Sequence, residues 1–153
     1  MHEGPGSMDD VLEELLIDSI PPRIVLAEDD PALRDLLAAF LRRDGYEVIE
    51  ARNGVELLKR IHQIGSSIFH GRAEPLDLVI TDFRMPGFSG LEVMECLRDA
   101  EWSLPVIVIT AFGDTTFHEH ARALGASEVL DKPFDLERLR QAVFRVVPPC
   151  SRS

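Results

Sequence analysis

The chain has 153 residues, 45% of them hydrophobic, and a net charge of −11, which fits one globular domain. No apolar stretch reaches the roughly 18 residues that a membrane-spanning helix needs, and no signal peptide is recognisable, so we expect a cytoplasmic protein with no membrane partner. The acidic balance argues against direct nucleic-acid binding, and two cysteines are too few for a disulfide framework.

The first part of the chain differs in composition from the rest. Residues 1–20 hold six acidic side chains and no Lys or Arg, so more than half of the net charge of −11 lies there. The opening MHEGPGS resembles an expression tag, and the apolar residues from Met8 to Ile20 fall on roughly one face of a helix. A short amphipathic helix and a frayed acidic tail both fit this pattern. We expect residues 1–22 to be an extension, residues 23–147 the domain and residues 148–153 a tail.

After this extension, strand and helix signals alternate five times, which predicts a parallel sheet with helical crossovers. The apolar runs that predict strands are 24–27, 47–51, 78–81, 106–110 and 129–130. The helices are expected to start at Asp30-Pro31, Asn53-Gly54, Ser89-Gly90, near Asp114 and at Asp135, and the first and fourth to end at Gly45 and Gly125.

The second helix is expected to bury Val55, Leu58 and Ile61. The following link, from Gly65 to Pro75, is longer than most connections. Its Ile68 and Phe69 are expected to fold back for burial, with a partner surface as the less favoured alternative. On the third helix, Cys96 is expected to lie near the core and to be inert.

Acidic side chains follow two of the predicted strands at the point where each strand ends. Glu28 and Asp29 follow the first strand, and Asp82 follows the third. Because ligands bind at the carboxyl edge of open parallel sheets, we expect these carboxylates in one pocket. Clustered carboxylates repel one another unless a cation lies among them, and oxygen ligands favour Mg²⁺ over zinc.

Two further strand ends carry groups that suit phosphoryl chemistry. The fourth strand ends in Thr110, followed by Ala111, and the fifth leads to Lys132-Pro133. A hydroxyl, an ammonium group and a cation can position a phosphoryl group and neutralise its charge, and Asp82 can act as a carboxylate nucleophile. We also expect a cis peptide bond before Pro133, because this loop must turn sharply.

In this order and spacing, these motifs resemble the receiver domain of response regulators, the CheY-like module of two-component signalling. The matching residues are Glu28-Asp29, Asp82 within DFRMPGFSG, Thr110-Ala111 and Lys132-Pro133. The resemblance covers roughly residues 23–147. It implies an α/β, flavodoxin-like, doubly wound fold with a five-stranded parallel sheet in the order 2-1-3-4-5 and helices on both faces.

The resemblance also implies a function and a metal site. A phosphoryl group would pass from a histidine kinase or phosphotransfer protein to Asp82, and the chain would catalyse only its own phosphorylation and dephosphorylation. The implied positions for Mg²⁺ are Glu28, Asp29, Asp82 and the backbone carbonyl of Arg84. Thr110 and Lys132 would bind the phosphoryl oxygens, and the backbone amide of Ala111 would face them.

Three features depart from the family's pattern or vary within it. The first acid of the pair is Glu28 rather than Asp, which the family tolerates, and its longer side chain could ligate the metal through water. The family often has an aromatic residue at the position of Val129, whose ring turns inward when the residue equivalent to Thr110 moves, so Val129 weakens the expectation of an aromatic switch. Arg84 and Phe112 occupy positions where the family tunes dephosphorylation. We expect these two long side chains to impede an attacking water and to give a slowly decaying phosphoform.

Other functions and partners stay open. A receiver that binds partners without phosphorylation is one alternative. An aspartyl-phosphate phosphatase is a weaker one, because Arg84 stands where that class has a second Asp. The His118-Glu119-His120 run has the wrong spacing for a metal site on a helix. The chain is either a stand-alone receiver or a piece of a longer regulator with an unknown output. Homodimers through the fourth and fifth helices are common in the family, and the candidate contacts are His118, Arg122, Asp131, Glu137 and Arg140.

Overall fold

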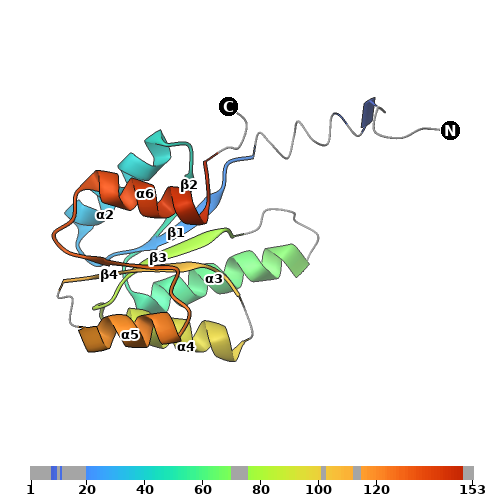
Figure 1. Ribbon diagram of the computed structural model, residues 1–153. Helices are drawn as coiled ribbons and strands as arrows, with labels where there is room; N and C mark the ends of the chain where they lie inside the picture. Colours follow the sequence, from blue (N-terminus) through green and yellow to red (C-terminus); the bar gives the residue numbers. More distant parts are fainter. Residues whose placement is uncertain are drawn as a thin grey trace.

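Strands and helices alternate along the chain as the sequence predicts (Figure 1). The computed structural model describes residues 8–9, 11, 20–69, 76–100, 103–111 and 115–149, without the side chains of 65–69. The strands are β1 (Arg23–Ala27), β2 (Glu47–Ala51), β3 (Leu78–Asp82), β4 (Val106–Thr110) and β5 (Glu128–Asp131). The helices are α2 (Pro31–Arg43), α3 (Gly54–Phe69), α4 (Gly90–Asp99), α5 (Thr115–Ala123) and α6 (Leu136–Val146).

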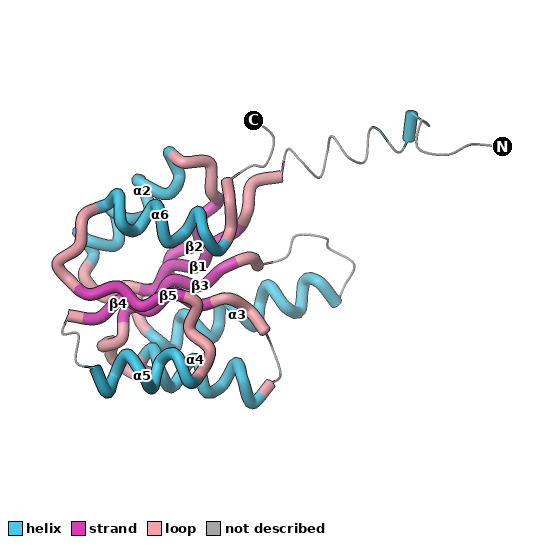
Figure 2. Tube along the Cα trace, viewed as in Figure 1, coloured by secondary structure: helices cyan, strands magenta, loops and turns pink. Residues whose placement is uncertain are grey.

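The five strands form one parallel sheet in the order β2-β1-β3-β4-β5, which confirms the predicted order. Helices α2 and α6 cover one face of this sheet, and α3, α4 and α5 cover the other (Figure 2). The doubly wound, flavodoxin-like fold class is therefore confirmed. In such a sheet all strands end at the same edge, and this edge carries the predicted site residues.

Two apolar cores lie on opposite faces of the sheet, because alternate residues of each strand point to opposite sides. On β1, Ile24 and Leu26 pack against α2 and α6, whereas Val25 and Ala27 pack against α3 and α4. The central strands β3 and β4 are buried along their whole length. This double burial explains why the strands appear as continuous apolar runs rather than as alternating ones.

Helix caps fix where the helices begin after the strand ends. The side chain of Asp30 accepts hydrogen bonds from the backbone N–H groups of Ala32 and Leu33, and Pro31 occupies the first turn. Ser89 and Glu92 form a capping box at the start of α4. At the end of α2, Gly45 has a φ of 101°, a backbone conformation that glycine adopts without strain.

The structure corrects three details of the sequence interpretation. Helix α3 continues to Phe69, so the first part of the predicted link is helical. Val55 is 41% exposed, and Leu57 is buried in its place. Cys96 is exposed rather than close to the core. The expected burial of the Ile68 and Phe69 side chains, and most of the N-terminal extension, lie outside the described residues. Among those residues, no helix combines the length and apolar character needed to cross a membrane.

Candidate functional site

The structure brings the predicted acidic residues together at the carboxyl edge of the sheet. Glu28, Asp29 and Asp82 each offer a carboxylate oxygen, and these oxygens lie within 4.8 Å of one another. Glu28 and Asp82 are buried, with 1% and 5% of their surfaces exposed, whereas Asp29 is exposed. The cluster therefore has two inner carboxylates and one that opens to solvent.

Backbone groups hold the two inner carboxylates in place. The Asp30 N–H donates to Oε2 of Glu28 at 3.0 Å, and the side chain of Arg34 donates from Nη1 to the backbone carbonyl of Glu28 at 2.9 Å. The Arg84 N–H donates to Oδ1 of Asp82 at 3.3 Å. A Cβ added at Gly90 would lie 2.9 Å from the backbone carbonyl of Asp82, so the start of α4 packs directly on this strand end. The sequence does not indicate a role for Arg34, because its contact with Glu28 depends on how α2 packs in three dimensions.

Lys132 reaches the acidic cluster from the end of β5. Its Nζ donates to Oδ2 of Asp82 at 2.7 Å and to Oε1 of Glu28 at 3.2 Å. The Lys132–Pro133 peptide bond is cis, as predicted, and the Lys132 N–H donates to the backbone carbonyl of Thr110. Burial alone would lower the pKa of Lys132, but its hydrogen bond to Asp82 and the charges of Asp82 and Glu28 raise that pKa above its usual value. Lys132 therefore supplies a positive charge at this site at neutral pH.

The charges of the cluster are not balanced by Lys132 alone. Burial, and then the proximity of Asp82, raise the pKa of Glu28 from 4.5 to about 7. Three carboxylates lie close to one ammonium group, and every atom that these carboxylates offer to a metal ion is an oxygen. A divalent, oxygen-preferring cation such as Mg²⁺ fits both the excess negative charge and the donor set.

The other predicted site residues surround this cluster. Thr110 is buried, with 3% of its surface exposed, at the end of β4 next to β3, and Ala111 follows it at the exposed edge. Val129 is buried on β5. The exposed Arg84 lines a groove of about 520 Å³ together with Asp29 and residues of the β3–α4 loop. Phe112 lies outside the described residues.

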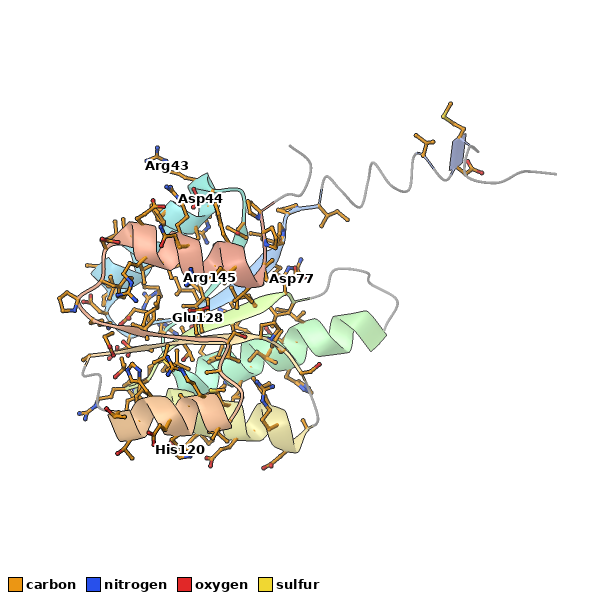
Figure 3. The ribbon with its side chains drawn as sticks, in the orientation of Figure 1. Arg43, Asp44, Asp77, His120, Glu128 and Arg145 are labelled. Carbon is orange, nitrogen blue, oxygen red and sulfur yellow. The ribbon has the colours of Figure 1, made fainter. Side chains whose placement is uncertain are left out.

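Four of the five candidate dimer contacts, all except Arg122, take part in side-chain contacts within the chain. Nε2 of His118 lies 2.8 Å from Oδ1 of Asp131, and Arg140 binds both Asp44 and Glu137. A neighbouring pair, Arg145 on α6 and Glu128 on β5, is labelled in Figure 3 and has an N–O distance of 3.1 Å. His118 is thus bound to a carboxylate at the sheet edge, and His120 is exposed on the outer side of α5 (Figure 3). The two histidine side chains therefore lie on different sides of α5, as their spacing in a helix predicts.

Comparisons with known proteins agree with this arrangement. Residues 24–144 match the family model described as the response regulator receiver domain. Sporulation initiation phosphotransferase F of Bacillus subtilis is 29% identical over 126 residues, which cover 82% of this chain and 94% of that protein. The transcriptional regulatory protein CrdR of Helicobacter pylori is 36% identical over 124 residues, which cover 80% of this chain and 54% of that protein.

Solved structures give the same result. A crystal structure of a response regulator receiver domain protein from Clostridium thermocellum has a TM-score of 0.67 at 28% identity and covers 82% of this chain and 94% of its own. Among the curated relatives, however, several are much longer: the chain spans about half of one regulator and about a quarter of another. The similarity therefore concerns one domain, and the longer relatives contain further parts.

Proposed function

The chain belongs to the response regulator receiver family, and from this membership we propose that it is a signalling switch phosphorylated on Asp82. Receiver domains of two-component systems are in general signalling modules rather than enzymes, and they bind Mg²⁺ at an acidic pocket. The observation that carries the proposal for Asp82 is its position: the carboxylate is buried, and its Oδ2 lies 2.7 Å from Nζ of Lys132.

The proposed reaction transfers a phosphoryl group from a phosphohistidine of a kinase or phosphotransfer protein. A carboxylate oxygen of Asp82 attacks phosphorus, a P–O bond forms and the P–N bond breaks, and the leaving imidazole keeps the electron pair and takes up a proton. Lys132 and the Thr110 hydroxyl bind phosphoryl oxygens, and the Ala111 amide donates to them. The name of the Bacillus relative, a phosphotransferase, supports this direction.

Mg²⁺ would be held by Glu28, Asp29, Asp82 and the backbone carbonyl of Arg84. When bound, it supplies positive charge next to the transferred group, which lowers the barrier by electrostatic stabilisation. The residues themselves position the nucleophile: the Arg84 N–H and Lys132 hold the two oxygens of Asp82 in place. The chain would therefore catalyse only its own phosphorylation and dephosphorylation.

Intact mass after incubation with Mg²⁺ and acetyl phosphate tests this proposal. We expect one phosphoryl adduct that depends on Mg²⁺ and is absent from Asp82→Ala. Asp29→Ala serves as a second variant, because it should weaken Mg²⁺ dependence while the acceptor stays in place. If the wild-type chain forms no adduct, the function of a receiver that binds partners without phosphorylation is favoured instead.

We also propose that Arg84 and Phe112 slow the loss of the phosphoryl group. Arg84 is exposed beside the acidic cluster, where its side chain restricts the path of an attacking water. Phe112 directly follows Ala111 in the chain. The half-life of the phosphoform should become shorter in Phe112→Ala, by up to about tenfold, which corresponds to about 1.4 kcal/mol in the barrier. An unchanged or longer half-life contradicts this role.

Phosphorylation is proposed to change how the domain contacts a downstream protein or an output domain. The longer relatives include transcriptional regulators, which supports an output of this kind. The cytoplasm is the expected location, since that is where response regulators typically act. Residues 23–147 remain our proposed domain, and a homodimer through α5 and α6 remains a proposal.

A further inference from the structure

Helix α5 is attached to the domain by few buried residues. Of its residues, Ala121 alone is fully buried, whereas α2, α4 and α6 each bury at least three. Its position therefore depends on specific contacts at its two ends. Figure 1 shows α5 and α4 together below the sheet, on the side opposite α2 and α6.

The first half of α5 contacts residues that directly adjoin the site. The ring of Phe117 packs on the ring of Phe83, with 4.0 Å between their centroids, and Phe83 is the residue after Asp82. The next residue, His118, donates from Nε2 to the carboxylate of Asp131 at 2.8 Å, and Asp131 is the residue before Lys132. The two residues that α5 contacts, Phe83 and Asp131, are thus each adjacent in the chain to a residue of the Lys132–Asp82 ion pair.

The other end of α5 is held by a residue in the last turn of α4, the end of that helix away from the site. Arg98, at the end of α4, donates from Nε to the backbone carbonyl of Leu124 at 2.8 Å and from Nη2 to that of Gly125 at 3.3 Å. These carbonyls lie just beyond the last turn of α5, where a cation is favourable. A displacement that begins at the site would therefore move the first half of α5 relative to this fixed end.

We propose that Phe83 is a positioning residue that transmits the state of Asp82 to α5 through its ring contact with Phe117. This inference rests on the proposed function and adds the route from the site to the surface. A phosphoryl group on Asp82 replaces the direct Lys132–Asp82 bond by contacts to phosphoryl oxygens. The backbone at Asp82 and at Lys132 must then adjust, and the residues adjacent to these two in the chain are Phe83 and Asp131.

The contact also offers a physical reason for transmission. Packed aromatic rings adjust by discrete changes in packing rather than by continuous deformation, since protein interiors are close-packed. Val129, on β5, has no ring that could make such a contact. Phe83 and Phe117 place two rings between the acceptor and the first half of α5. Both side chains are partly buried against the core on this face of the sheet.

Backbone amide chemical shifts test the inference on the full chain. Mg²⁺ and beryllofluoride, a non-covalent mimic of a bound phosphoryl group, are added to the wild type, Phe83→Leu and Phe117→Leu. We expect amides at the site, such as those of Arg84 and Lys132, to shift in all three proteins. The shifts of α5 amides, from His118 to Ala123, should fall at least twofold in both variants.

Controls separate transmission from simple loss of packing. Phe144→Leu removes a ring on α6, on the opposite face of the sheet, and should leave the α5 response unchanged. Phe83→Tyr keeps the ring and should restore the response. If the α5 amides of Phe83→Leu shift as much as those of the wild type while the site amides also shift normally, the inference is overturned and the proposed function is not. Site amides that do not shift in the wild type overturn the proposed function and this inference with it.

Discussion

The carboxyl group of Glu28 lies almost fully inside the protein, close to the ammonium group of Lys132 and to the carboxylate of Asp82. Burial and the neighbouring carboxylate together raise its pKa from 4.5 to about 7. The folded protein therefore binds this proton more tightly than the unfolded chain does. Because of this difference, the free energy of unfolding should fall as the pH rises from about 4.5 to about 7.

Glu28→Gln should remove this pH dependence, because the amide has a similar shape and no charge. Without Mg²⁺, we expect the variant to be more stable than the wild type at pH 8, on the order of 2 kcal/mol, and to differ little from it at pH 5. Urea unfolding at the two pH values, in EDTA, measures the difference.

Adding Mg²⁺ should reverse the order of stability at pH 8. At the proposed metal site, the cation would bind the folded wild type and stabilise it by mass action, whereas the Glu28→Gln variant lacks one of the proposed carboxylate ligands. Glu95→Gln, which neutralises an exposed carboxylate on α4, is the matched control and should change stability little at either pH. If the Glu28→Gln variant is no more stable than the wild type in EDTA at pH 8, then Glu28 does not carry the electrostatic cost that we assign to it.

At the level of elements, the strands were predictable to within one residue at each end, because strands buried on both faces are continuous apolar runs. The helix starts were equally clear where a cap residue marks them, as Asp30, Ser89 and Asp135 do. The packing face of α3 was not predictable in detail. Its apolar residues extend around more than one side of the helix, so Val55 and Leu57 compete for the buried position, and only contact with the sheet selects Leu57.

The candidate site, too, could be predicted only in part from the sequence. Its carboxylates, hydroxyl and lysine could be located from the sequence, since each lies at or just after a strand end and all parallel strands end at one edge. The contacts of long side chains that cross between elements could not. Arg98 reaches from α4 to the end of α5, and Arg140 reaches from α6 to Asp44, after the end of α2. Neither contact has a spacing or motif that would reveal it before folding.

For the whole molecule, the structure suggests that the domain needs a few residues beyond the matched family region, which ends at residue 144. The hydroxyl of Tyr46, after α2, donates to the backbone carbonyl of Val147, after α6, at 2.6 Å. Val146 and Val147 also pack against the core between these helices and the sheet. The hydrogen bond between Tyr46 and Val147 joins two segments that lie 101 residues apart in the chain.

A fragment of residues 23–147 should therefore keep the stability of the full chain, whereas a fragment of residues 23–144 should lose on the order of 2 kcal/mol, from one hydrogen bond and partly buried valine side chains. Tyr46→Phe separates the two contributions. It should cost about 1 kcal/mol in the longer fragment and almost nothing in the shorter one, where the acceptor is already missing. Urea unfolding of the full chain and of the four fragments, with and without Tyr46→Phe, gives these differences. An equal cost of Tyr46→Phe in both fragments would show that the hydroxyl stabilises the domain through some other partner than Val147.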